Sequence, residues 1–298
     1  MAKNRLARRG LDFQNQHVMI TGGSSGIGRA MARLFVQGGA HVSILARRQA
    51  LLDEALAELE GLRTSPAQRL VARSVDVTDL SNLEQTIGAL MEGGYPADIL
   101  INAAGIAHCG HFEDVSMPDF YRTVEVDLYG TVNAVKAVVP TMIERQKGHI
   151  VNFSSVLGFT TSFGYTAYCA AKFGVRGFSD ALRHEVKPHG IYVSCVFPQD
   201  TDTPQLHQER AMQPFEARCI SEGANSVLDV DRVARSIVRA IARRKKYILP
   251  GLEIKVFFPL IDGSRFLSGF FAWFFVDRVV ARVRRQRELG VDSRDAVA

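Results

Sequence analysis

The sequence predicts an α/β fold, with a doubly wound parallel sheet of about seven strands and helices on both faces. Short β-branched runs alternate with segments whose apolar residues recur at three-and-four spacing. A glycine-rich turn follows the first of these runs. The 298 residues, 47% hydrophobic and 22% charged, are enough to bury a core of this size.

The candidate strands lie at residues 17–20, 41–45, 70–77, 98–102, 149–154, 191–197 and 247–249. Between them, segments such as GRAMARLFVQGG have helical periodicity and end in glycine, which often stops a helix. Because each helix returns the chain to the same end of the sheet, the strands should be parallel. We expect a basic N-terminal segment at 1–13, one α/β domain at 14–250, and a hydrophobic, arginine-rich helical appendage at 251–298.

Charge and cysteine content indicate which partners, metal sites and cellular location to expect. The net charge of +5 is concentrated in MAKNRLARR, ARRKK and RVRRQR, which suit an anionic surface or are simply solvated helix ends. The four cysteines have no metal-site spacing, so we expect reduced thiols and no metal. Neither a secretory signal nor a run of about 20 apolar residues is found, which predicts a cytoplasmic protein.

The turn TGGSSGIG after the first strand has the features of a phosphate-binding loop. Gly22 allows the tight turn, Gly26 allows backbone to approach a pyrophosphate, and Gly28 allows the helix to pack on the strand. The following helix presents free N–H groups to the phosphates. This pattern predicts a dinucleotide site, and a plain glycine turn is the alternative.

The end of the second strand favours NADPH as the dinucleotide. Folds that prefer NAD place an acidic residue there for the ribose hydroxyl, whereas this chain has Arg47 and Arg48. Two guanidinium groups suit a 2′-phosphate, although they could also open a solvated helix. Further along, Asp76 is placed to meet the adenine, and NAAG at 102–105 ends the fourth strand beside the cofactor.

A second group of residues carries the expected chemistry. Tyr168 and Lys172 are four residues apart, on one face of a predicted helix, and Ser155 follows the fifth strand. A tyrosine needs a neighbouring cation to lower its pKa from about 10 for acid–base work at neutral pH. We expect Lys172 to lower it, Ser155 to stabilise the substrate oxygen, and Tyr168 to protonate a ketone that receives hydride.

Together, TGGSSGIG, NAAG, the Ser155–Tyr168–Lys172 set and the proline after the sixth strand resemble the short-chain dehydrogenase/reductase family over residues 14–250. The resemblance implies a Rossmann sheet of seven parallel strands and a homo-oligomer, often a dimer or tetramer, while NADPH remains the cofactor expected from Arg47 and Arg48. The catalytic residues it implies are Ser155, Tyr168, Lys172 and Asp127. The cofactor-binding residues expected are Gly22, Ser24, Ser25, Gly26, Ile27, Gly28, Arg47, Arg48, Asp76, Val77, Asn102, Ala103, Ala104, Gly105, Tyr168, Lys172, Pro198, Thr201 and Thr203.

Two positions depart from the family pattern. Asp127 stands where the family usually has an asparagine that supports the lysine through a water, so the proton relay should be rearranged. Gln199 follows Pro198 where the family usually has glycine, and its side chain should reshape the floor of the nicotinamide site.

The segment from GYTAYCAAKFG to DTDTPQL resembles the 3-ketodihydrosphingosine reductase subfamily. This resemblance implies a long-chain keto-sphingoid base as substrate and a role in sphingolipid synthesis, with no nucleic-acid partner. Two alternatives stay open. The chain could reduce another bulky lipid ketone, such as a steroid or a 3-oxoacyl chain, or it could be an NADP(H)-binding scaffold without turnover.

The tail FLSGFFAWFFVDRVVARVRRQREL, which begins at Phe266, is rich in phenylalanine and then in arginine. Its longest uncharged stretch, 266–276, is too short to cross a bilayer. Such a segment suits the boundary between acyl chains and anionic headgroups, which would make the protein peripheral on the cytoplasmic face of a membrane. An apolar clasp onto a second subunit is the alternative.

Overall fold

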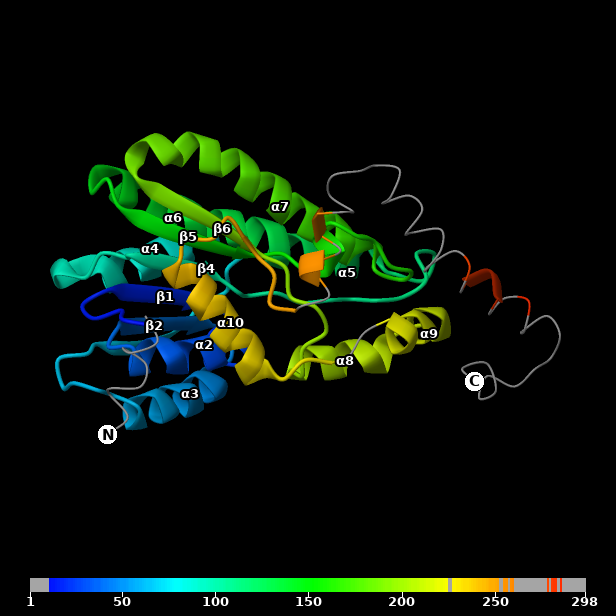
Figure 1. Cartoon of the computed structure of the whole chain (residues 1–298), viewed down its shortest axis with the longest axis horizontal. Coiled ribbons are helices and arrows are strands. Elements are labelled where there is room, and N and C mark those ends of the chain that lie inside the picture. Colours follow the sequence, from blue (N-terminus) through cyan, green and yellow to red (C-terminus); the bar gives the residue numbers. More distant parts are fainter. Residues whose placement is uncertain are drawn as a thin grey trace.

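Seven parallel strands form a single sheet in the computed structural model, in the order β3-β2-β1-β4-β5-β6-β7 (Figure 1). The strands are β1 (His17–Thr21), β2 (His41–Ala46), β3 (Leu70–Ser74), β4 (Ile99–Asn102), β5 (Gly148–Phe153), β6 (Ile191–Val196) and β7 (Tyr247–Ile248). In the central register, Val18 lies opposite Val42 on one side and Ile99 on the other. The predicted fold is confirmed, and the strand order reverses direction between β1 and β4.

Helices cover both faces of this sheet (Figure 1). One face carries α2 (Gly26–Gln37), α3 (Gln49–Gly61) and α10 (Val230–Ala242), and the other carries α4 (Leu80–Met91), α6 (Gly130–Glu144) and α7 (Thr166–Val186). At the carboxyl ends of the strands lie α5 (Met117–Val124), α8 (Pro204–Met212) and α9 (Phe215–Ala224). Single turns occur at η1 (Glu92–Gly94), η2 (Glu125–Tyr129), η3 (Val156–Gly158) and η4 (Lys187–His189).

Helix α10 shows how sequence pattern produces this layering. Its buried residues Val233, Ala234, Ile237, Val238 and Ile241 recur at helical spacing and form one apolar stripe against the core. The side chain of Asp229 accepts a hydrogen bond from the amide of Arg232 at 2.7 Å, which caps the helix.

The structure describes residues 11–224 and 227–251, and beyond them residues 254–256, 258–259, 278, 280–282 and 285. Leu11 and Phe13, expected in the N-terminal segment, are buried in the core instead, and Phe13 packs edge-on against Phe35. Ile254 and Phe258, expected in the appendage, are buried beside Phe197. The core therefore extends past both expected domain boundaries.

The predicted contact of the apolar tail at 266–276 with a membrane or a second subunit lies outside the described residues. Among the residues that are described, no helix is both long enough and apolar enough to span a bilayer.

Candidate active site

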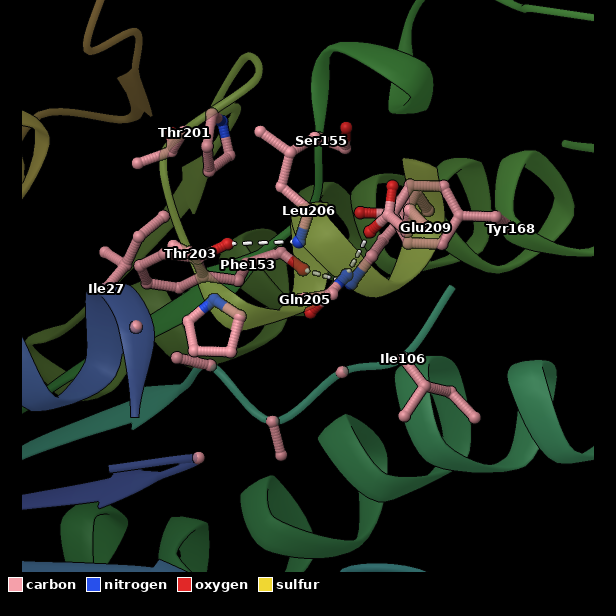
Figure 2. Close-up of a pocket in the computed structure, with 18 of the residues that line it drawn as sticks. Ile27, Ile106, Phe153, Ser155, Tyr168, Thr201, Thr203, Gln205, Leu206 and Glu209 are labelled. Atoms are coloured by element: carbon pink, nitrogen blue, oxygen red, sulfur yellow. Dashed lines mark hydrogen bonds between the residues drawn. The ribbon is translucent and has the colours of Figure 1, made fainter. Parts of the chain in front are cut away.

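A cavity of about 310 Å³ opens at the carboxyl ends of the strands, where the strand order reverses. Ligands of open α/β sheets bind in this position because the loops after the strands diverge there. Every site residue predicted from the sequence lines the cavity except Asn102 and Asp127, which lie behind its wall. Figure 2 shows the side where Ser155, Tyr168 and Glu209 meet.

The glycine turn forms one end of the cavity with the geometry that a dinucleotide needs. Gly22 and Gly26 have positive φ angles of 72° and 53°, which glycine adopts without strain. A Cβ on Gly22 would lie 2.6 Å from the Ala103 carbonyl oxygen, and one on Gly28 only 2.3 Å from that of Gly22. Thr203, which caps α8, lies 3.3 Å from the space that a Gly26 Cβ would fill. The turn is thus a close-packed backbone cradle at the start of α2, and it fits a pyrophosphate.

Arg47 and Arg48 follow β2 and line the neighbouring wall. Asp76 is engaged from several sides: it accepts hydrogen bonds from the Thr78 hydroxyl at 2.8 Å and from Arg122 at 2.7 Å. The guanidinium of Arg47 is 3.9 Å from Asp76 and half exposed, so it can turn toward a ligand. The Asp76 carboxylate is thus held in place at the wall of the cavity.

Asn102 lies beneath the cavity rather than in its lining. It is almost completely buried, and its amide donates to Asn152 Oδ1 at 2.9 Å, while Asn152 donates to the Ser179 hydroxyl at 2.9 Å. This chain of hydrogen bonds joins β4, β5 and α7. Asn102 therefore holds β4 and β5 together beneath the cavity and does not face into it.

Ser155 and Tyr168 are brought together from β5 and α7. The Ser155 Oγ accepts a hydrogen bond from the Leu157 amide at 3.2 Å and is hydrogen-bonded to the Tyr168 hydroxyl. A carbonyl oxygen in the cavity can therefore receive two hydroxyl hydrogen bonds at once. That arrangement stabilises negative charge developing on the oxygen and supplies a proton to it.

Lys172 and Asp127 form a buried ion pair behind Tyr168. The Lys172 Nζ lies 3.0 Å from Asp127 Oδ2, donates to the Phe153 carbonyl at 3.2 Å, and sits 5.3 Å from the Tyr168 ring centre. Asp127 Oδ1 accepts from the Ile106 amide at 2.8 Å. The rearrangement expected from the Asn-to-Asp difference is thus a direct carboxylate–ammonium contact.

This pairing changes the expected electrostatics of Tyr168. Burial raises the pKa of Tyr168 well above 10, and the carboxylates of Glu209 and Asp127 raise it further. The pKa of Tyr168 is thus raised where a lowered value was predicted, and the Lys172 ammonium expected to lower it is paired with Asp127. A raised pKa keeps the phenol protonated, which is the form that a proton donor requires.

Several lining residues were missed by the sequence prediction, and they belong to the segment after β6. Asp200, Leu206, Glu209 and Gln213 all face the cavity. One signal was present: Asp200, Asp202 and Glu209 place three acids within ten residues after a strand whose carboxyl end was expected at the site. DTDTP itself begins α8, since Thr203 accepts from the Leu206 amide at 3.3 Å and Pro204 occupies the first turn.

Comparison with known proteins agrees with this geometry. Residues 16–214 match the family described as short chain dehydrogenase. The chain is 39% identical over 240 residues to the 3-ketodihydrosphingosine reductase of Bos taurus, covering 80% of this chain and 72% of the relative. It is also 39% identical over 230 residues to the 3-dehydrosphinganine reductase of Danio rerio, covering 77% and 69%.

Among solved structures, a short-chain dehydrogenase from Sphingobium yanoikuyae in complex with NADPH aligns with a TM-score of 0.73 and 29% sequence identity. The alignment covers 84% of this chain and 93% of that one. The sheet, the glycine turn and the cavity are therefore those of a known group of dinucleotide-binding enzymes.

Proposed function

The chain belongs to the short chain dehydrogenase family, and we propose that it reduces 3-ketodihydrosphingosine to dihydrosphingosine with NADPH. The observation that carries the proposal is the convergence of Ser155, Tyr168 and Lys172 on one cavity that the glycine cradle also lines. The relatives named above act on this long-chain 2-amino-3-ketone, and the sphingoid reductase resemblance of DTDTP points the same way.

The residues of the cavity fit NADPH. Gly22 and Gly28 let the backbone of the turn pack closely at the start of α2, where phosphates bind, and the two residues that follow β2 are Arg47 and Arg48 and not an acid that would repel a 2′-phosphate. Arg47 and Arg48 would hold that phosphate, and Lys172 would hold the nicotinamide ribose. When bound, NADPH supplies the hydride that adds to the carbonyl carbon.

The protein's own residues then perform the proton transfer. Ser155 hydrogen-bonds the ketone oxygen and fixes its position. Tyr168 gives its proton to that oxygen as negative charge develops there, and a proton from solvent later restores the phenol. Asp127 holds Lys172 in place behind Tyr168 through the 3.0 Å contact.

Substitution of Tyr168 by phenylalanine tests this mechanism. Loss of the proton donor should lower kcat by about 10²–10⁴-fold on 3-ketodihydrosphingosine, while NADPH still binds with its fluorescence change. Phe173→Leu, an exposed position on the same helix, is the matched control. Full activity in Tyr168→Phe would contradict the assignment, and no turnover of the sphingoid ketone by the wild type would contradict the function.

We also propose that the apolar and basic tail attaches the enzyme to a membrane surface, from which a long-chain substrate would enter. The support is its composition, since aromatic residues followed by arginines suit an anionic interface. A chain ending at residue 262 should lose binding to anionic liposomes. Retained binding, with a change from a dimer or tetramer to a monomer, would favour a contact between subunits instead.

A further inference from the structure

Two carboxylates in the cavity take no part in the proton transfer. Asp200 and Glu209 line the same cavity as Ser155, Tyr168 and Lys172. The lysine is paired with Asp127, and within the part of the chain that the structure describes neither Asp200 nor Glu209 forms an ion pair. The substrate side of the cavity therefore holds two acidic groups that have no cation at contact distance among the described residues, although Arg210 acts on Asp200 and Lys172 on Glu209 from farther away.

Glu209 is the carboxylate that acts on the reacting groups. It lies on α8, and Figure 2 shows its side chain and that of Tyr168 directed into the same pocket. After burial, the charge of Glu209 is the largest influence on the pKa of Tyr168, whereas Asp200 is not among the causes. Glu209 is thus the acidic group placed beside the ketone position.

The surroundings hold Glu209 in this orientation. Gln205 donates to its Oε1 at 2.8 Å, and the Cys109 thiol donates to its backbone carbonyl at 3.3 Å. At the end of α8, Gln213 donates to the buried Tyr165 hydroxyl at 2.6 Å, which docks the helix against the cavity wall. Among the described residues none donates a hydrogen bond to Glu209 Oε2, so this oxygen is available to a ligand.

The electrostatic environment favours a cation at this point. The pKa of Glu209 is raised to about 7: burial is the largest cause and the nearby carboxylates of Asp200 and Asp127 add to it, while the hydrogen bond from Gln205 and the charge of Lys172 lower it. An isolated carboxylate is costly here, and a positively charged group brought into the cavity would remove that cost.

We propose that Glu209 binds the protonated amino group that neighbours the substrate ketone, and so selects 2-amino ketones over neutral lipid ketones. This inference rests on the proposed function, in which the carbonyl oxygen lies between Ser155 and Tyr168. The nitrogen of a 2-amino-3-ketone is only two bonds from the carbonyl carbon, so fixing the carbonyl also fixes the ammonium beside Tyr168. A steroid or 3-oxoacyl ketone has no cationic group at this position, so the Glu209 carboxylate stays without a positive partner.

Recognition of the amine also affects the chemistry. The negative charge of Glu209 raises the pKa of Tyr168. An ammonium ion between them cancels this influence, and Tyr168 becomes a stronger acid when an amino ketone is bound. Binding of an amino ketone therefore lowers the pKa of Tyr168, whereas binding of a neutral ketone does not.

The test compares two ketones that differ only in the amine: 3-ketodihydrosphingosine and its deamino analogue 1-hydroxyoctadecan-3-one. The quantity measured is the ratio of their kcat/KM values in NADPH oxidation. In Glu209→Gln this ratio should fall about 10- to 100-fold, the effect of losing a hydrogen bond to a charged group. Asp202→Asn likewise replaces a carboxylate by its amide, at an exposed residue on the same segment whose carboxylate pairs with His207, and it should keep the wild-type ratio.

The outcomes separate this inference from the proposed function. If the wild type fails to reduce 3-ketodihydrosphingosine, the proposed function is wrong, whatever Glu209 does. If the wild type reduces it but Glu209→Gln keeps the selectivity ratio, the inference is overturned.

A second measurement uses the wild type alone, so it does not depend on the variant folding. Octadecan-2-amine should inhibit the reaction about 10-fold or more tightly than octadecan-2-ol, because only the amine can pair with Glu209. Equal inhibition by the two compounds would also overturn the inference.

Discussion

Asp127 Oδ2 lies 3.0 Å from the Nζ of Lys172, and both side chains are almost entirely shielded from solvent. Burial raises the pKa of Asp127, against the lowering effects of the Lys172 ammonium and the Ile106 amide. The pair is coupled to Tyr168, because the Asp127 charge also raises the pKa of the phenol. The protonation states of Asp127, Lys172 and Tyr168 are therefore coupled.

Replacing Asp127 by asparagine should lower the pKa of Tyr168. The amide keeps the shape and an acceptor for Lys172 but removes the charge that raises the pKa of Tyr168. In the reverse reaction, oxidation of dihydrosphingosine, Tyr168 must be ionised, so the rate rises with pH. The midpoint of that rise should shift to lower pH in Asp127→Asn, as measured by NADPH formation.

Glu125→Gln is the control for this shift, since it makes the same change at an exposed position of the same turn, η2. An unchanged midpoint in Asp127→Asn would mean that Asp127 does not influence the proton donor.

Replacing Arg47 and Arg48 together by alanine should reduce the preference for NADPH over NADH. Both line the cavity, and each charge-assisted contact with a 2′-phosphate contributes about a tenfold difference or more. The measurement is the ratio of kcat/KM for the two cofactors. Arg73→Ala, at an arginine on β3 outside the cavity lining, should leave the ratio unaltered, and an unaltered ratio in the double variant would refute the assignment.

Gly28→Ala should weaken both cofactor binding and folding. The added Cβ would lie 2.3 Å from the Gly22 carbonyl oxygen, and two backbone segments cannot separate without opening the cradle. We expect a loss of about 1–3 kcal/mol in the free energy of unfolding, together with a higher Kd for NADPH.

Gly88→Ala, on α4, is the matched control because nothing lies within 4 Å of its Cβ position. It should stabilise the helix by about 0.5–1 kcal/mol. A Gly28 variant with wild-type stability and cofactor affinity would show that the turn is not close-packed.

Acid should destabilise the protein partly through His149. This side chain is buried and hydrogen-bonded to the Ser194 hydroxyl at 2.7 Å, and burial lowers its pKa from 6.5 to about 4. The unfolded chain takes up the proton near pH 6.5 and the folded chain only near pH 4, so stability from the neutral imidazole is lost across that window as pH falls. His17 follows the same rule, with a pKa of about 4.

The comparison of His149→Asn with the wild type isolates this contribution. The wild type should be the more stable at pH 7, and its advantage should shrink by about 3 kcal/mol between pH 6.5 and 4, measured by urea unfolding. His184→Asn, at an exposed histidine of α7, is the control. A constant difference across the window would count against a buried neutral His149.

The strands and the first-strand turn were predictable because their signals are local. Strand propensity, helical spacing and glycine positions act over a few residues, and β1, β2 and β6 begin at the expected residue. Tyr168 and Lys172 were placed on one helix face by spacing alone. The core boundaries were less predictable: Leu11 and Ile254 belong to the core because of distant partners, which no local pattern reveals.

By itself the sequence determined the parallel sheet, the glycine turn and the candidate proton donor Tyr168, since each depends on short-range spacing. Only the tertiary structure decided the electrostatics. It brought Asp127 against Lys172 and placed Glu209 beside Tyr168, although these partners come from separate elements of the chain. Coulomb interactions depend on distance and burial in the folded state, so the pKa of Tyr168 is raised where the sequence predicted that it would be lowered.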